Sequence, residues 1–251
     1  EGTSARGMFE CSDRHMSSIS QAAQAHKGPL TFRLYAIEGY CASCAASGDA
    51  MPAAVGNRFY KAPDADDLLL LEKTNRAWAR QRSKLPHPTA TIADYEKTNR
   101  LTVHNYRKWS ELFNPRQLLA LGWMLQAIRA EPDQMLREAL TAAFLGTIEH
   151  QNMLNIYYLP YAQSAGAFGR HDFHPKVNAC EGNPWGGSKG RGTFKLSYKT
   201  VREGKQYLLH PFEPDYRTGT RRRTPTGEAV TARQVGSFDD LTANGSGVWL
   251  R

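Results

Sequence analysis

The sequence predicts a mixed α+β fold, with a helical hairpin at its core and a smaller, basic, β-rich part toward the C-terminal end. Two long amphipathic segments in the middle of the chain predict the hairpin. Short segments in which apolar and polar residues alternate predict strands on either side of it. The 251 residues are 41% hydrophobic and 22% charged, which is ordinary for a globular protein with a buried core.

Residues 1–62 form a mixed segment of short elements. A short helix is expected over Ser17 to His26. The alternation over Leu30 to Ile37 predicts a strand. Small residues dominate Ala42 to Gly56, which we expect to be a loop.

Residues 63–160 form the predicted helical domain. Its first helix should begin near Pro63-Asp64, because proline suits a first helical turn and aspartates there interact favourably with the helix dipole. A linker should then run from the proline pair at 86 and 88 to about Leu101. One stripe of this first helix should carry Leu68, Leu71, Asn75, Trp78 and Arg82.

The hairpin consists of the next two helices. Asn114 is a good N-cap with Pro115 in the first helical position, and Glu131-Pro-Asp133 separates the two helices. Because the connection is so short, the helices should pack against each other. Their apolar faces should be formed by Leu118, Leu121, Gly122, Leu125 and Ile128 in the first helix, and by Leu136, Leu140, Ala143, Phe144, Thr147 and Ile148 in the second.

Residues 161–251 form the predicted basic, β- and loop-rich segment. Alternating residues predict strands over Thr193 to Tyr198 and over Gln206 to Leu209. From Glu213 to Gly247 the chain is rich in Thr, Gly and Arg, which fits either a β-rich appendage or a partly disordered segment.

Positive charge is concentrated in this last segment. The chain has a net charge of +8, and residues 184–233 hold eleven Lys or Arg against four acidic residues, a net +7. Such a concentration attracts a polyanion, and DNA is the expected partner. Interleaved aromatic residues could stack on an extruded base; a solvated basic surface is the alternative. The predicted DNA-binding residues are Lys189, Arg191, Lys195, Lys199, Arg217, Arg221, Arg222 and Arg223.

Two short motifs near the N-terminal end predict a structural zinc site. Cys41-x-x-Cys44 has the spacing of half a tetrahedral zinc site, and Cys11-x-x-x-His15 could supply the other half. The alternative is a set of free cysteines in a loop. Four cysteines are too few for a secreted disulfide framework, so we expect a reducing cytoplasm. Neither a membrane-spanning run nor a signal peptide is apparent.

Six sequence segments resemble one family: the large bacterial adenine-specific DNA methylases that carry a zinc ribbon and are associated with anti-phage defence. In family order these segments form the middle of a much longer protein, and both ends of the chain suggest cuts through a longer polypeptide. The sequence departs from the family pattern at the zinc ribbon. A ribbon usually has two CxxC knuckles, and this sequence has one. The segments are Arg33 to Gly39, Arg58 to Asp64, Trp109 to Gly122, Glu149 to Leu154, Phe168 to Pro175 and Ala179 to Trp185.

The resemblance implies an insertion or central portion of an α/β methyltransferase, which positions DNA and supports the catalytic sheet. The whole enzyme would transfer a methyl group from S-adenosylmethionine to an adenine amino group, and the rest of that polypeptide would be a partner. We expect this region alone to be inactive. It has no Gly-rich turn after a strand for the cofactor. Asn183-Pro-Trp185 lacks the second proline of the amino-methyltransferase motif, which should instead follow Arg251.

Two other classes of function remain open. The chain could be a non-catalytic DNA-binding or adaptor module of a phage-defence complex, or a purely structural helical subdomain. The amides of Gln151 and Asn152 can pair with adenine, although such amides more often cap helices or join buried hydrogen-bond networks. A Gly-rich cofactor motif upstream and an Asp-Pro-Pro-Tyr type motif downstream would favour the methyltransferase.

Overall fold

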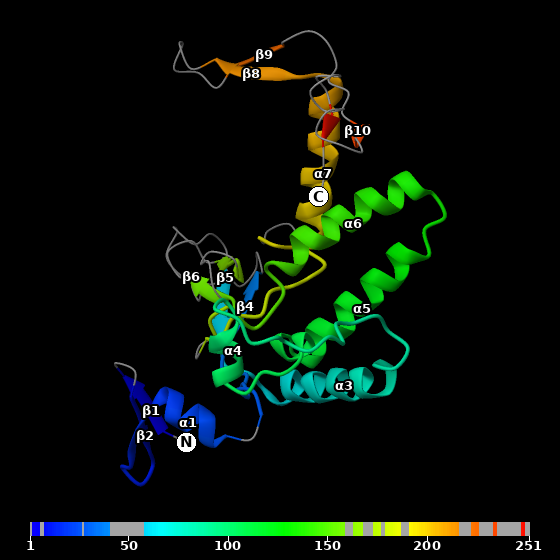
Figure 1. The fold of residues 1–251 in the computed structure, drawn as a ribbon. Coiled ribbons are helices and arrows are strands. Elements are labelled where there is room, and N and C mark those ends of the chain that lie inside the picture. The colour runs from blue at the N-terminus through cyan, green and yellow to red at the C-terminus, as the bar shows by residue number, and fades with distance from the viewer. Residues whose placement is uncertain are drawn as a thin grey trace. The chain divides into compact units, whose positions relative to one another are not determined.

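The predicted α+β class is confirmed (Figure 1). Helices and small strand pairs alternate along the chain, and every pair but the last is antiparallel. None of the described helices combines the length and apolar character needed to cross a lipid bilayer. The computed structural model describes residues 2–5, 8–26, 28–40, 58–158, 163–167, 173–176, 179–186, 191–215, 222–225, 233–234 and 247–248.

The N-terminal part is a three-stranded sheet of β1 (Gly2–Ala5), β2 (Met8–Cys11) and β3 (Met16–Ser18), in that order. The predicted helix follows as α1 (Ile19–Ala25). It begins there because the side chains and backbone N–H groups of Ser18 and Gln21 bond reciprocally, each at 3.1 Å.

A second strand pair joins β4 (Ile37–Tyr40) to β5 (Arg58–Lys61), and Arg58 pairs with Glu38 across it at 2.7 Å. The strand predicted over residues 30–37 is therefore wrong except at its last residue. Alternation alone does not make a strand, since a strand also needs a partner, and β5 pairs only with residues 37–40. The loop predicted over residues 42–56 lies outside the described residues.

The first long helix is α3 (Ala65–Gln81). Its N-cap is Asp64, whose side chain and backbone exchange hydrogen bonds with Asp67, both at 3.0 Å. Pro63 thus precedes the cap and does not lie in the first turn as predicted. The predicted linker is also shorter than expected, because α4 (Asn99–Val103) begins before Leu101.

The predicted hairpin is confirmed as α5 (Pro115–Arg129) and α6 (Gln134–Ile148), which follow the short 3-10 helix η2 (Trp109–Leu112). The side chain of Asn114 accepts the Gln117 N–H at 2.9 Å, and Asp133 caps α6 in the same way. Helix α5 packs against α3 on one side and α6 on the other. The hairpin core consists of Leu121, Met124, Ile128 and Phe144.

A second apolar cluster lies around η2 and α4. Phe113 packs against both clusters and so joins them into one core. Tyr106 is buried in the second cluster, and this burial raises its pKa to about 12. The buried members of the cluster are Ile92, Leu101, Tyr106, Leu112 and Leu154.

The C-terminal part differs from its prediction, because the residues predicted as two strands form one helix, α7 (Phe194–Leu209). Alternation from Phe194 to Tyr198 fits a strand, but only the helical period continues over sixteen residues, with Phe194, Val201 and Leu208 less exposed than their neighbours. The Oγ1 atom of Thr193 accepts the Leu196 N–H at 3.2 Å and starts the helix. Residues 1–197 and 198–251 form separate compact units, and the division falls within α7.

The remaining strands are short. Each forms a two-stranded pair, and the last pair is parallel. The pairs are β6 (Ile156–Tyr158) with β7 (Gln163–Ala165), β8 (Phe212–Asp215) with β9 (Arg222–Pro225), and β10 (Arg233–Gln234) with β11 (Gly247–Val248).

We predict that Asn114→Ala lowers the free energy of unfolding by about 1–2 kcal/mol, because the substitution removes an N-cap and also a bond to Glu181 at 2.6 Å. Asp133→Ala removes only the cap of α6 and should cost less, about 1 kcal/mol. Urea unfolding of both variants measures the difference. Equal losses would mean that the Glu181 bond adds no stability.

Candidate functional site

The turn between β2 and β3 brings a thiol, a carboxylate and an imidazole together. One ligand atom from each of Cys11, Asp13 and His15 lies within 4.8 Å of the others. The turn is tight because Arg14 adopts a positive φ of 62°. The Cys11 N–H donates to the His15 carbonyl at 3.1 Å, and the His15 N–H donates to the Cys11 sulfur at 3.3 Å.

This donor set fits zinc. Thiolate, imidazole and carboxylate are the three side-chain types that bind zinc in proteins. The N–H directed at the Cys11 sulfur holds that atom on the same side of the turn as the other two donors. The structure thus brings together two predicted ligands, Cys11 and His15. Cys41 and Cys44 lie outside the described residues, so a four-ligand site remains a prediction.

The predicted DNA-binding residues fall in several parts of the chain. Arg191 is exposed in the loop before α7, and Lys195 and Lys199 are exposed on α7 itself. Arg222 and Arg223 lie in β9, where the structure describes only the backbone. Lys189, Arg217 and Arg221 lie outside the described residues.

Helix α7 carries a row of basic side chains. Lys195, Lys199 and Arg202 recur at intervals of four and three residues, so they project from one side of the helix, and all are exposed. Arg202 was not among the predicted site residues, since it lies between the two predicted strands and only the observed helix places it on one side with the two lysines. The helix contains one acidic residue, Glu203, which lies 3.6 Å from Lys199.

A buried polar segment follows α6 and contains the predicted amide pair. The Nδ2 of Asn152 donates to the carbonyls of Ile148 and Glu149 at 3.0 Å, so Asn152 caps the end of α6. The Nε2 of Gln151 donates to the Gly192 carbonyl at 2.9 Å. These amides therefore have structural roles. The backbone of the same segment bonds elsewhere, with Met153 N–H donating to the Leu112 carbonyl at 2.7 Å.

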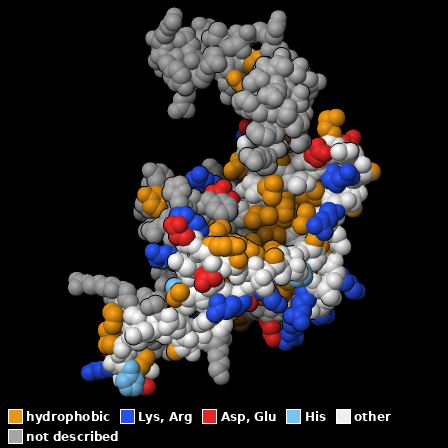
Figure 2. Space-filling model, in the orientation of Figure 1, with side chains coloured by type: hydrophobic (Ala, Val, Ile, Leu, Met, Phe, Trp, Pro, Cys, Tyr) orange, Lys and Arg blue, Asp and Glu red, His pale blue; other side chains and the backbone are white. Residues whose placement is uncertain are grey.

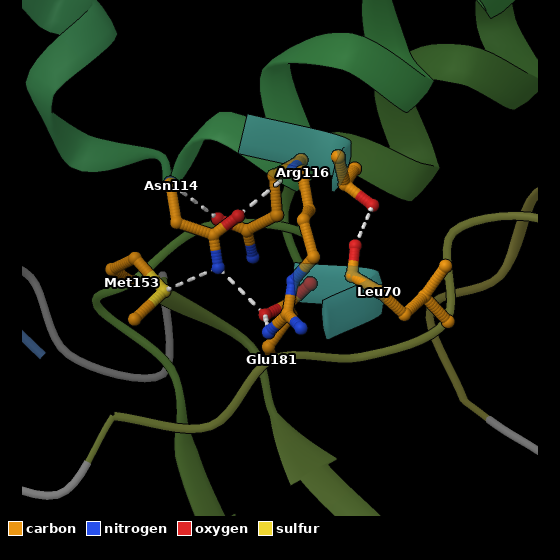
Figure 3. A network of polar contacts seen from close by, with 7 residues as sticks. Leu70, Asn114, Arg116, Met153 and Glu181 are labelled. Carbon is orange, nitrogen blue, oxygen red and sulfur yellow. Dashed lines mark hydrogen bonds and ion pairs between the residues drawn. The ribbon is translucent and has the colours of Figure 1, made fainter. Parts of the chain in front are cut away.

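The start of α5 meets this region through Glu181. Figure 3 shows the side chains of Asn114, Arg116 and Glu181 directed toward one another. The Asn114 Nδ2 donates to Glu181 at 2.6 Å and also contacts the Met153 sulfur at 3.5 Å, and Arg116 forms an ion pair with Glu181. Three of the segments that carry the family resemblance therefore meet here. A fourth contacts the first of them, because the ring of Phe173 lies 5.2 Å from that of Trp109, between ring centres.

His150 lies at the beginning of the buried segment. Burial lowers the pKa of its imidazole, the Arg191 guanidinium lowers it further, and the Glu149 carboxylate opposes both. The backbone of Gly192 runs so close to His150 that a side chain at position 192 would overlap the ring. The surroundings of His150 therefore favour its neutral form.

Neither the protein-family models, nor the curated proteins, nor the solved structures contain a match to this chain. Sequence reasoning missed two residues of the candidate sites. Asp13 could have been found from the alternating Cys-x-Asp-x-His pattern, which suits a turn between strands. Arg202 could have been found from the helical spacing of the basic residues in α7.

We predict that Cys11→Ala and His15→Ala each weaken zinc binding by at least about tenfold, because each removes a side chain that would bind the metal. Asp13→Asn should weaken zinc binding less, because it weakens a ligand without removing it. Competition with a chromogenic chelator measures the affinity. Cys180→Ala is the control: its thiol is a poor ligand because burial raises its pKa to about 11. Unchanged affinity in the His15 variant would exclude this turn as the site.

We predict that the protein loses stability as the pH falls below about 6.5, the ordinary pKa of histidine. The pKa of His150 is lowered in the folded state, so the unfolded chain binds a proton first and is favoured as the pH drops. His150→Gln should flatten this dependence between pH 7.5 and 5. Substitution of the exposed His210 should leave it unchanged. Urea unfolding at each pH tests this, and parallel curves for the wild type and the His150 variant would contradict it.

Proposed function

We propose that this chain contacts the phosphate backbone of DNA through α7, as the central DNA-positioning and scaffolding region of an S-adenosylmethionine-dependent adenine-specific DNA methyltransferase. The observation that carries the DNA contact is the exposed basic row of Lys195, Lys199 and Arg202. A helix that keeps charged side chains at fixed spacing on one side can meet successive phosphates. Base-specific contacts are not required for this role.

Charge and composition support the same partner. Residues 184–233 carry a net charge of +7, so the helix lies in the most basic part of the sequence. Only one of the three basic side chains, Lys199, has an acidic neighbour among the described residues, and both members of that pair are more than half exposed. An exposed pair of this kind contributes little and can exchange its partner for a phosphate.

The methyltransferase assignment rests on the resemblance of six sequence segments to that family. Methyl transfer would require the cofactor site and the Asp-Pro-Pro-Tyr type motif of the whole enzyme, so the chain alone is proposed to be inactive. The alternative proposal is a non-catalytic DNA-binding or adaptor module of a phage-defence complex. Methyl transfer to DNA by the chain alone would contradict both.

We predict that replacing Lys195, Lys199 and Arg202 together by alanine weakens binding to duplex DNA and lowers the slope of log K against log salt by up to about 3, since each phosphate contact contributes about 0.9. Fluorescence anisotropy with a labelled duplex, over a series of salt concentrations, measures both quantities.

The control removes the same charge elsewhere. Lys97, Lys108 and Arg129 are exposed and lie in three separate parts of the chain, and their joint replacement by alanine should leave the slope close to that of the wild type. If the α7 variant and this control behave alike, α7 does not contact DNA. If the unaltered chain does not bind DNA even at low salt, the proposed function is wrong.

A further inference from the structure

A second concentration of positive charge lies outside the basic C-terminal segment. Residues 73–84 contain five Lys or Arg and no acidic residue, a net charge of +5 over twelve positions. All five side chains are exposed. Figure 2 shows Lys and Arg side chains gathered on the surface over α3. We call this set the α3 basic face; it consists of Lys73, Arg76, Arg80, Arg82 and Lys84.

The side of α3 opposite Lys73, Arg76 and Arg80 is held against the core. The Nε1 of Trp123 on α5 donates to the Gln81 side chain at 2.9 Å, and Trp78 packs edge-to-face on His87 with 5.2 Å between ring centres. Gly122 of α5 lies close to Leu85, since a Cβ at position 122 would come within 3.1 Å of the Leu85 Cβ. These contacts fix the rotation of α3, so its basic face is kept toward solvent.

The charges on this face are mostly available. Arg76 pairs with Glu72 one turn earlier on the helix, and both side chains are more than half exposed. For the other four basic residues the described part of the chain offers no acidic partner. Part of the arrangement favours helix stability, since cations near a helix C-terminus interact well with the dipole. That effect reaches Arg82, the C-cap of α3, but it does not account for Lys73 and Arg76, which lie before the last turn.

We propose that the α3 basic face is a second surface that binds duplex DNA, by contact with phosphates and without reading bases. Lys73, Arg76 and Arg80 lie on one side of the helix and span roughly 10 Å. Duplex DNA carries one negative charge per about 1.7 Å of its axis, so this row faces several phosphates. The inference rests on the proposed function, in that both take DNA as the partner, but it concerns a different helix.

The other end of α3 argues against an anionic membrane as the partner. The exposed leucines at 68, 69 and 70 would have to enter the lipid, but Asp66 and Asp67 lie beside them in the first turn, directly after the N-cap Asp64. These carboxylates would be repelled by an anionic bilayer surface. DNA can contact the basic half of the helix and leave the acidic half in water.

The test uses the triple variant Lys73→Ala, Arg76→Ala, Arg80→Ala in the same anisotropy experiment. We expect affinity for the duplex to fall at least about tenfold at low salt and the salt slope to fall by up to about 3. Combining this variant with the α7 variant should lower the slope further. If the α3 variant binds like the variant of Lys97, Lys108 and Arg129, the inference is wrong, while a lower slope in the α7 variant would still support the proposed function.

Two further measurements complete the test. The first separates a loss of charge from a loss of folding, and the second separates DNA from an anionic membrane as the partner. The double variant Arg82→Ala, Lys84→Ala changes side chains only at and beyond the C-cap of α3, so it should lower the slope by up to about 2 with at most a small fall in the thermal melting temperature. An unchanged salt slope in this variant would contradict the proposal that the α3 basic face binds DNA. Sedimentation with phosphatidylserine vesicles provides the last comparison: vesicle binding that the triple variant abolishes, with unaltered DNA binding, would overturn the assignment to DNA.

Discussion

The structure depends on the burial of a polar segment, residues 150–155, directly after α6. A buried polar group that loses its hydrogen-bond partner costs about 1–3 kcal/mol, so the bonds that this segment makes are important for stability. The partners of this segment come from distant parts of the chain: the Gly192 carbonyl for Gln151, the Leu112 carbonyl at the end of η2 for Met153, and the Cys180 N–H for the Asn155 carbonyl at 3.0 Å. Loops that have little regular structure of their own are thereby fixed against the hairpin. The absence of a side chain at Gly192 follows from the same constraint, since the loop must approach His150 closely.

The two proposed DNA surfaces share one design. In each, basic side chains recur at helical spacing, with Lys73 and Arg76 on α3 and Lys199 and Arg202 on α7 as examples. A helix holds such charges in a row at a low entropic cost, and the row then meets a polyanion without rearrangement of the backbone. The two helices differ in how they pack against the rest of the protein. Helix α3 packs along α5, whereas no side chain of α7 is fully buried.

The sequence was most informative where structure is local. Asn114-Pro115 and Asp133 identified the starts of α5 and α6, because capping depends on residues three positions apart. The Cys11 and His15 spacing likewise placed two donors in one turn. The predictions of strands were wrong where the secondary structure depends on contacts between residues far apart in the sequence. The five alternating residues at the start of α7 fit the period of a strand and that of a helix equally well. The extent of β4 is set by the length of β5, with which it pairs. No local pattern shows that Gln151 bonds a carbonyl 41 residues away.

The bond between Asn114 and Glu181 spans 67 residues of sequence, and this separation has a consequence for the order of assembly. During synthesis the hairpin of α5 and α6 can close as soon as residue 148 is available, because its contacts have low contact order. The first turn of α5 receives Glu181 only after β6, β7 and the loops beyond them have been made. During synthesis, the hairpin of α5 and α6 is therefore expected to form first, with Asn114 still hydrogen-bonded to water. Glu181 replaces that water when the later loops have been made and pack against the start of α5.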